Sequence, residues 1–401
     1  TTAKLCLIDD GTPQRSRQFE IARAARFIKG SGLPVRIPVV EMIEIGAGGG
    51  SIARIDELGR LMIGPDSAGA NPGPACYGLG GCHPTVTDAD VALGLIDPTY
   101  FAESRVRIKP RAATGAIKSK LGAELGLNIQ ESAYGISQMV DENMANAARV
   151  HGVEHGTQIS NRTLIAFGGN GPLHATRLAD KTGIDHIIIP HNPGVGSAVG
   201  FLSAPISYEI IRSLYMLLSQ FDQIAVEHLF RSMEKEARSV VTAGATSDRL
   251  IESRFAFMRY EGQGHEVQIP LPQGKLSEKL DQYLRTKFEQ IYQQTFGRTV
   301  PNVDIEVINW GVMTSTPLTI QPAIPSARRT REAPPRGFRR IYWGQYRERL
   351  KVPYFHRDDL SRGDYILGPA LIIESQTTTL VGPYFKATID AAQNIVMRRY
   401  K

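Results

Sequence analysis

The sequence predicts a mixed α/β protein, and three observations lead to this fold class. In RTLIAFGGNGPLHATRLADKTGIDHIIIP, residues 162–190, a short apolar run, a glycine turn, a helical pattern and a second apolar run follow one another. Such a β-turn-α-β unit builds parallel or mixed sheets with helices on their faces. The other two observations are long helical patterns on both sides of this unit, and a final stretch of short strand-like segments.

Short strands and turns are expected at the start of the chain. Residues 5–13, LCLIDDGTP, form an apolar run that ends in turn residues, and residues 34–45 form a second, β-branched run. Residues 51–64 predict a hairpin that turns at residues 57–59. The stretch 67–84 is too rich in Gly and Pro for a regular element, so we expect an ordered loop, which in a compact domain is often functional.

Helices are predicted from capping residues and from apolar spacing. Thr and Asp residues precede an apolar run in residues 85–97, as at an N-capped helix. Apolar residues recur at three- and four-residue spacing over residues 130–150. Residues 193–202 are expected to begin a helix after a glycine turn, and two further helices are predicted at 220–243 and 276–296.

The pattern of predicted helices and strands changes beyond residue 205, which suggests a division into domains. Strand patterns at 251–258 and 265–271 lie between the last two helices. After a basic, proline-bearing linker at 327–340, the last sixty residues or so are mainly strand-like. We therefore expect a first domain at 1–205, an α+β region at 206–325 and a small β-rich C-terminal module at 326–401.

Composition excludes several classes of partner. The chain has 401 residues, of which 42% are hydrophobic and 21% charged, as is usual for globular proteins. The net charge of +6 is spread along the chain apart from the linker, without a basic groove interleaved with aromatic residues, so no nucleic-acid partner is expected. No apolar segment approaches the ~20 residues needed to cross a membrane. Three cysteines and no secretory pattern at the start favour a cytoplasmic location.

The first glycine cluster lies in IEIGAGGGSIARID, residues 43–56. Clustered glycines raise the entropy cost of ordering the backbone, so they are expected where side chains would obstruct a ligand. The backbone N–H groups of Gly48, Gly49 and Gly50 can point together at a phosphate, and Ser51 adds a hydroxyl donor. A tight strand connection without a ligand is the alternative.

The second glycine cluster is FGGNGPLHA, residues 167–175, directly between a strand and a helix. Glycines there let a ligand approach a helix N-terminus, where the helix dipole favours anions, although a tight turn explains them too. Pro172 suits the first turn of the helix. His174 follows one turn into the helix and is a candidate acid, base or metal ligand, or else a packed and hydrogen-bonded helix residue.

Carboxylates flank the ordered loop at 67–84. Asp66 precedes the loop, and Asp88 and Asp90 follow it. Carboxylates near phosphate loops often hold Mg²⁺ directly or through water. The same residue type is also expected at the N-cap and in the first turn of a helix. The sequence therefore leaves a metal site and helix capping as alternatives.

Two further groups carry weaker signals. Cys76, Cys82 and His83 have the spacing C-x5-C-H, without a second pair to complete four zinc ligands, so a structural or incidental role is expected. His265 and Glu266 lie in a predicted turn between strands. They could reach an active site, but a hairpin alone explains them.

Taken in order, these motifs resemble the hydantoinase A and 5-oxoprolinase family, which also includes subunits of ATP-dependent acetone and acetophenone carboxylases. The resemblance spans nearly the whole chain, and SAGANPGPACYG with PTVTDAD is its most specific part. The matching stretches are TTAKLCLIDDG, GSGLPVRIPVVEMIEIGAGGGSIARID, GPDSAGANPGPACYGLGGCHPTVTDAD, AFGGNGPLHATRLAD, PGVGSAVGFL, RYEGQGHE and, more weakly, GPALIIES.

The resemblance implies an ATPase lobe of the actin, sugar-kinase and heat-shock chaperone type, in which ATP lies between two related lobes. Thr1 and Thr2 look like the tail of the second lobe's phosphate loop, and Gly168, Gly169 and Asn170 look like the turn that borders the adenosine. The N-terminal lobe with the first phosphate loop is absent from this sequence. We expect that lobe to be a separate chain or to have been removed, unless the sequence is a fragment.

The resemblance also implies a function. We expect ATP-dependent opening of a cyclic amide, such as a hydantoin or 5-oxoproline, through phosphorylation of its carbonyl oxygen within a hetero-oligomer that contains a hydantoinase B-like subunit. Thr1, Thr2 and the loop from Gly48 to Ser51 would hold the ATP phosphates, and Asp88 would be the catalytic group that holds Mg²⁺ or positions water. Two alternatives stay open: a ketone carboxylase subunit that phosphorylates an enol or bicarbonate, and an assembly subunit that binds ATP without turnover.

Overall fold

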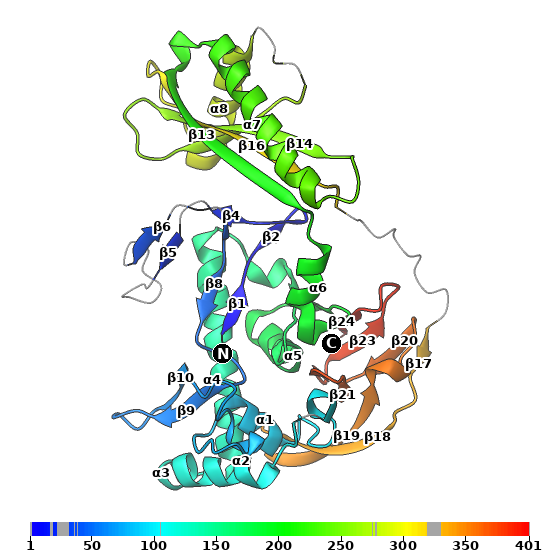
Figure 1. Cartoon of the computed structure of the whole chain (residues 1–401). Helices are drawn as coiled ribbons and strands as arrows, with labels where there is room; N and C mark the ends of the chain where they lie inside the picture. The colour runs from blue at the N-terminus through cyan, green and yellow to red at the C-terminus, as the bar shows by residue number, and fades with distance from the viewer. Residues whose placement is uncertain are drawn as a thin grey trace. The chain divides into compact units, whose positions relative to one another are not determined.

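The computed structural model describes residues 2–16, 19–21, 32–35, 37, 39–104, 106–274, 276, 279–318 and 330–400. The chain forms two compact units, one of Thr1–Val199 with Ala323–Lys401 and the other of Gly200–Pro322 (Figure 1). Both units combine helices with strands, which confirms the predicted α/β class. The three-part division at residues 205 and 325 stays a prediction about domains. By their contacts, the strands after Ala323 belong to the same compact unit as Thr1–Val199.

A six-stranded mixed sheet forms one layer of the first unit. The predicted β-turn-α-β unit is confirmed, because the first two strands are parallel neighbours joined by a helix. The second of these strands then pairs antiparallel with the last strand of the chain. The sheet runs β11 (Thr163–Ile165), β12 (His186–Ile189), β24 (Ile395–Arg399), β23 (Phe385–Ile389), β20 (Asp364–Leu367) and β17 (Arg331–Glu332), and the joining helix is α5 (Gly171–Thr182).

A second sheet of four strands shares the core with this layer. Its strand β22 packs against α5, and its buried side chains form a common apolar cluster with those of the six-stranded sheet, including Ile187, Phe385 and Met397. The strand-like character predicted for the last sixty residues or so is confirmed, since most of this stretch forms strands. The sheet runs β18 (Gly337–Trp343), β19 (Glu348–His356), β21 (Ala370–Ile373) and β22 (Thr378–Val381).

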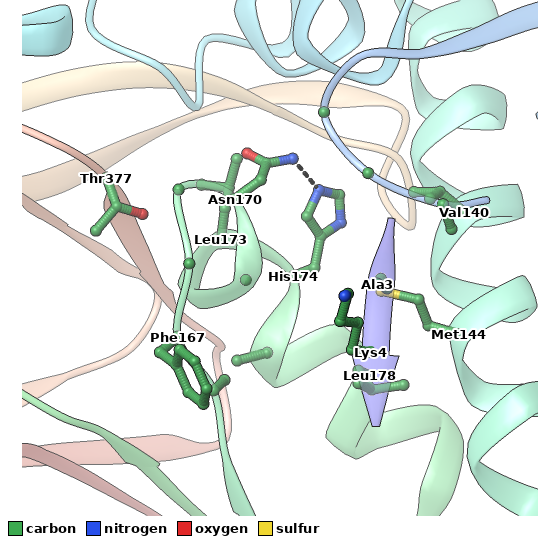
Figure 2. Close-up of a pocket in the computed structure, with 18 of the residues that line it drawn as sticks. Ala3, Lys4, Val140, Met144, Phe167, Asn170, Leu173, His174, Leu178 and Thr377 are labelled. Carbon is green, nitrogen blue, oxygen red and sulfur yellow. Dashed lines mark hydrogen bonds between the residues drawn. The ribbon is translucent and has the colours of Figure 1, made fainter. Parts of the chain in front are cut away.

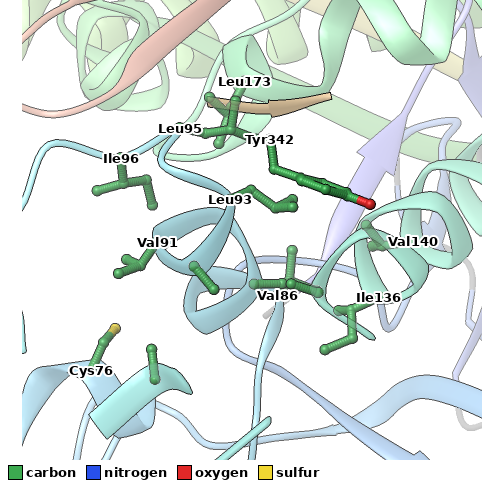
Figure 3. Close-up of a cluster of buried hydrophobic side chains, with 14 of the residues drawn as sticks. Cys76, Val86, Val91, Leu93, Leu95, Ile96, Ile136, Val140, Leu173 and Tyr342 are labelled. Carbon is green, nitrogen blue, oxygen red and sulfur yellow. The ribbon is translucent and has the colours of Figure 1, made fainter. Parts of the chain in front are cut away.

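Two helices of the first unit, α1 and α4, begin at capping boxes. Thr85 accepts a hydrogen bond from the backbone of Asp88, whose carboxylate accepts one from the backbone of Thr85, and Asn128 and Glu131 repeat this arrangement. Figure 3 shows the apolar core where the helices meet, with Val86, Ile136 and Leu173 from three of them. The helices are α1 (Val86–Leu93), α2 (Pro110–Ile117), α3 (Ala123–Leu125), α4 (Ile129–Glu154), α5 and, after a 3₁₀ turn, α6 (Gly196–Ser203).

Short antiparallel pairs make up the described part of the N-terminal region. The turn of residues 10–11 has φ of 50° at Asp10 and 74° at Gly11, and the hairpin predicted at 57–59 turns at Gly59 with φ of 74°. From residue 68 to 84 the sole regular element is a 3₁₀ turn, Ala75–Tyr77, so the predicted ordered loop is confirmed. The strands are β1 (Ala3–Leu5), β2 (Ile8–Asp9), β3 (Thr12–Pro13), β4 (Arg15–Ser16), β5 (Phe19–Ile21), β6 (Leu33–Val35), β7 (Val39–Val40), β8 (Ile43–Ile45), β9 (Ser51–Ile55) and β10 (Leu61–Ser67).

The second unit is an antiparallel four-stranded sheet with two helices. Trp310 is fully buried in its core, where its ring meets Phe230 at 5.7 Å and its indole N–H donates to the carbonyl of Leu214. The two predicted helices and the two predicted strands are confirmed, whereas β13 and β16 were not predicted. The sheet runs β13 (Ser207–Leu217), β16 (Ile305–Ser315), β14 (Ile251–Tyr260) and β15 (Val267–Leu271), with helices α7 (Gln223–Gly244) and α8 (Leu280–Phe296).

Across the described ranges, we find no helix whose length and apolar character suit it to cross a bilayer.

The core of the second unit gives a stability prediction. Phe288 is fully buried on α8, so Phe288→Ala leaves a cavity and should cost about 3–5 kcal/mol. Phe296 is 45% exposed on the same helix, and Phe296→Ala is the matched control with a much smaller cost. The chain has two tryptophans, so the substitution Trp343→Phe leaves the fluorescence of Trp310 as a reporter of this unit in urea. Equal midpoints for the two Phe variants would contradict the assigned core.

Candidate nucleotide and substrate site

A cavity of about 1290 Å³ in the first unit brings the two glycine clusters together. Its wall includes most of the residues predicted to bind a ligand: Thr2, Gly48, Gly49, Gly50, Gly168, Gly169 and Asn170. In Figure 2, β1 and the α4 side chains Val140 and Met144 lie on one side, and Phe167 and Thr377 on the other. Thr1 lies outside the described residues. The cavity therefore unites segments from the first residues of the chain, its middle and its C-terminal strands.

The first glycine loop is anchored to the start of α1. The carbonyl of Gly49 accepts hydrogen bonds from the backbone N–H of Thr87, at 2.8 Å, and from its hydroxyl, at 2.9 Å. A Cβ atom on Gly49 would lie 2.7 Å from that hydroxyl oxygen, so the close approach requires glycine. Ser51 is fully buried, where its hydroxyl accepts from the N–H of Gly48 and donates to the carbonyl of Gly46. Ser51 thus braces the loop from within.

The second glycine cluster lies directly beside the first. Gly168 has φ of 98°, a conformation that favours glycine, and its N–H donates to the carbonyl of Pro193 at 2.7 Å. A Cβ atom on Gly49 would lie 3.8 Å from the side-chain nitrogen of Asn170. The predicted phosphate loop and the predicted adenosine turn are therefore neighbours, although 120 residues separate them.

Behind Asn170 lies a buried cluster of charges from three helices. His174 on α5 is 4% exposed, with Nδ1 2.6 Å from Asp141 Oδ1 on α4 and Nε2 3.4 Å from Asp90 Oδ2 on α1. The Nε of Arg177 lies 2.8 Å from the other oxygen of Asp141. Burial lowers the pKa of His174, but the two carboxylates outweigh burial and raise the pKa to about 9. Burial raises the pKa of Asp141, but Arg177 and His174 hold this pKa below its usual value.

The charge on His174 is coupled to the orientation of Asn170. The amide nitrogen of Asn170 lies 3.1 Å from Asp90 Oδ2 and 2.8 Å from His174 Nε2 (Figure 2). This nitrogen can donate to Nε2 only when the imidazole is neutral there. When Nε2 carries a proton, the amide must turn its oxygen to the ring instead. The protonation state of His174 therefore sets which amide group Asn170 presents beside the cavity.

The carboxylate of Asp88 is buried and fully hydrogen-bonded, whereas a metal ligand or catalytic group needs a free oxygen. Asp88 is fully buried, and its carboxylate accepts from the N–H groups of Ala75, Cys76 and Thr85 and from the hydroxyl of Thr85, at 2.7–3.1 Å. A carboxylate has about four acceptor positions, and these donors use them. Asp88 fastens the loop at 67–84 to α1 and does not line the cavity. Its predicted catalytic and metal roles stay predictions, and this geometry favours capping.

The other predicted candidates lie apart from the cavity wall. Cys76 is buried and Cys82 exposed, and burial raises the pKa of the Cys76 thiol far above its usual value, which fits a structural role. Asp66 pairs with Arg54 on the surface. His265 belongs to the second unit. Within the ranges given above, the structure contains no group of three or more His, Cys, Asp or Glu side chains able to hold a metal ion.

Three residues of the site were missed at the sequence level: Asp141, Arg177 and Glu374. Asp141 interrupts the apolar stripe of α4 directly after Val140, and a charge at a core position of a helix is a detectable signal. Arg177 follows His174 by three residues, so it shares a helix face with it. Glu374 ends the buried run of β21, but only the tertiary structure brings it to the cavity.

The charge cluster predicts a pH dependence of stability. Because the pKa of His174 rises from 6.5 to about 9 on folding, its contribution is fully present below about pH 6.5 and is lost as the pH rises through about 9. The melting temperature should therefore fall over this range, and His174→Gln should remove that part of the slope. His191→Gln, at an exposed histidine, is the control. Parallel melting curves for the wild type and His174→Gln at every pH would contradict the assignment.

Comparison with known proteins shows which family the chain resembles. The family model described as hydantoinase/oxoprolinase matches residues 1–210, and the model described as hydantoinase/oxoprolinase C-terminal domain matches residues 222–399. Caprolactamase subunit alpha of Pseudomonas jessenii is 31% identical, over 89% of this chain and 52% of that protein. Acetophenone carboxylase gamma subunit of Aromatoleum aromaticum is 31% identical, over 89% of this chain and 50% of that protein.

Solved structures share the fold. The crystal structure of the ATP-dependent caprolactamase from Pseudomonas jessenii matches with a TM-score of 0.71 and 29% identity, over 94% of this chain and 55% of that chain. A nucleotide-free acetone carboxylase structure matches with a TM-score of 0.84 over 100% of this chain and 57% of that one, and at 23% identity this likeness concerns the fold alone. The chain spans about half the length of the curated relatives it matches. With family models that cover both its glycine clusters and its C-terminal strands, the chain belongs to the hydantoinase/oxoprolinase family.

Proposed function

We propose that this chain is part of an ATP-dependent enzyme that opens a cyclic amide of the hydantoin or 5-oxoproline type. The observation that carries the proposal is the meeting of two glycine clusters at one cavity, where Gly49 and Asn170 are neighbours. Relatives named caprolactamase and acetophenone carboxylase subunit support ATP-dependent chemistry on a carbonyl compound.

The residues on the cavity wall suit ATP as a co-substrate. The N–H groups of Gly49 and Gly50, with Thr2 nearby on the wall, can point at phosphate oxygens, while the N–H of Gly48 donates to Ser51. The turn of Gly168, Gly169 and Asn170 opens α5, so its backbone approaches a nucleoside without obstruction from side chains. Thr1 belongs to the same predicted phosphate loop, and Ser51 would act indirectly by bracing Gly48.

The chemistry follows from the low reactivity of a ring amide. Transfer of a phosphoryl group to the carbonyl oxygen makes the carbonyl carbon electrophilic and gives the oxygen a good leaving group. Such a transfer depends on alignment and on positive charge near the phosphates. His174 is a cation on the cavity wall, but Asp90 and Asp141 compensate its charge, so the backbone N–H donors of the glycine loop carry this part of the proposal. Mg²⁺ commonly binds through the phosphates themselves with few protein ligands, whereas the Asp88 carboxylate is occupied by hydrogen-bond donors.

Partners complete the proposed enzyme. The relatives are named as subunits, and the chain covers about half of their length. We infer that a second lobe with the first phosphate loop, in the same or another polypeptide, closes the nucleotide site. A hydantoinase B-like subunit would carry out hydrolysis of the phosphorylated amide in a hetero-oligomer.

A ketone carboxylase is the second candidate, because acetophenone and acetone carboxylases are among the similar proteins. There the phosphorylated species would be an enol or bicarbonate at the same nucleotide site. Phosphate release by the assembled enzyme separates the candidates. Stimulation by a cyclic amide, with appearance of the ring-opened acid, supports the hydrolase. Stimulation by a ketone only when bicarbonate is present supports the carboxylase. ATP binding with no stimulation by either supports an assembly subunit.

The glycine loop gives a sharper prediction about ATP. Gly49→Ala places a methyl group 2.7 Å from the Thr87 hydroxyl, so the loop must move and ATP affinity should fall about tenfold or more. Gly115→Ala is the control, because a Cβ atom on Gly115 meets open space in α2. Isothermal titration with a non-hydrolysable ATP analogue measures both, and Gly49→Ala combined with Thr87→Ala, which removes the Thr87 hydroxyl, should recover part of the affinity. Equal affinity of Gly49→Ala and wild type would contradict the assignment of this loop to the nucleotide site.

A further inference from the structure

Glu374 lies at the cavity on a turn from the C-terminal part of the chain. The turn joins β21 to β22, with the N–H of Glu374 donating to the carbonyl of Thr377 at 2.9 Å. Residues 373–378 all line the cavity, and Figure 2 shows Thr377 across from Asn170. A Cβ atom on Gly169 would lie 4.0 Å from the carbonyl oxygen of Gln376. The turn is therefore packed against the predicted adenosine turn.

The carboxyl group of Glu374 is in an unusual state for a surface acid. Its Oε1 atom is buried and has no hydrogen-bond partner within the described part of the chain. Burial raises the pKa of Glu374 to about 7, although Arg357 opposes the rise, and Asp358 adds to it. The Arg357 side chain is itself buried and donates to the carbonyl of Gln393. A carboxylate with this pKa is a stronger base than an ordinary glutamate and still ionises near neutral pH.

Asp97, the other carboxyl group on the described cavity wall, and the two histidines of that wall contact other residues. Asp97 pairs with Arg339 and accepts from Thr99, and although burial opposes the effect, these partners hold its pKa below the usual value. His174 is enclosed by two carboxylates that keep it charged. His151 packs its ring against that of His155 at 4.5 Å. Of the two carboxyl groups on the described cavity wall, Glu374 is the one with an oxygen that has no hydrogen-bond partner there.

Phosphorylation of a carbonyl oxygen requires the loss of a proton. In a ring amide, the carbonyl oxygen forms a bond to the γ-phosphorus while the bond from that phosphorus to the bridging oxygen breaks and ADP leaves. The N–H proton next to the carbonyl departs, and its electron pair forms the C=N bond of the phosphorylated imidate. In a ketone the proton leaves the adjacent carbon, and the electron pair forms the C=C bond of an enol phosphate. Both candidate substrates thus need a base at the same relative position.

We propose that Glu374 is the general base that removes this proton. The proposal rests on the proposed function, and it assigns to the C-terminal strands a direct part in the chemistry. The carboxylate of Glu374, on the cavity wall, accepts the proton from the atom next to the carbonyl carbon, and Gln376 and Thr377 keep the turn against the glycine cluster at 168–170.

Glu374→Gln in the assembled enzyme tests the proposal. The amide keeps the size of the side chain but cannot accept the proton, so kcat should fall about 10²- to 10⁴-fold, the usual contribution of a general base. Affinity for a non-hydrolysable ATP analogue should change less than about threefold. In the wild type, kcat should rise with pH through about 7 as Glu374 ionises, and the variant should lose this limb. Glu348→Gln, at an exposed glutamate on β19, is the control.

An infrared titration gives a readout that does not depend on turnover. The wild type should show a protonated carboxyl band that disappears through about pH 7 and is missing from Glu374→Gln. The proposal is overturned if the variant keeps kcat and the pH limb, or if its ATP affinity falls as much as kcat, which would make Glu374 a nucleotide contact. If neither a cyclic amide nor a ketone stimulates the wild type, the proposed function fails and this inference fails with it.

Discussion

The geometry of the site depends on one constraint: charges that are buried must be paired. Asp90, Asp141, His174 and Arg177 come from α1, α4 and α5, and the first three are nearly or fully inaccessible to water. Removing one partner of such a cluster leaves an uncompensated charge and costs about 3–5 kcal/mol. The three helices therefore have one relative position in which the cluster is satisfied. That position puts Asn170 beside Gly49.

The site combines charged groups that keep their charge near neutral pH with one carboxyl group that titrates there. The fixed charges belong to the helical core, where carboxylates hold His174 as a cation over the whole physiological range. The titratable carboxyl, Glu374, lies on a turn between two strands from the end of the chain. His174 and Glu374 both line the cavity. Under the proposed function, the first would keep a constant charge and the second would change protonation within the cycle.

Local features of the fold could be predicted from the sequence because local interactions determine them. The turn at Gly59, the capping box at Thr85 and Asp88, and the strand, glycine turn and helix at 163–182 each depend on neighbours within a few residues. Pairing of β12 with β24 joins Ile189 to Ile395, which lies 206 residues further along the chain, and no local pattern reports this pairing. The strands β13 and β16 were not predicted, because polar residues interrupt their apolar runs and buried positions do not recur at every second residue.

Functional residues were harder to predict for the same reason. The glycine clusters can be recognised in the sequence, because clustered glycines are expected where the backbone takes an unusual conformation or closely approaches a ligand. Asp88 and Asp90 are two residues apart on one helix, yet Asp88 turns to the loop at 67–84 and Asp90 to Asn170, which only the packing of α1 decides. Glu374 carries no sequence signal of its importance. Burial raises its pKa, against the effect of Arg357, and the packing of segments that are distant in sequence brings it to the cavity wall.

Hydrogen exchange with and without a non-hydrolysable ATP analogue tests the central claim most directly, that both glycine clusters form one nucleotide site. The account predicts that the analogue slows exchange at the amides of residues 48–51 and of residues 168–171 together, because the two segments meet at Gly49 and Asn170. Protection of one segment without the other, or protection confined to another part of the chain, would contradict it.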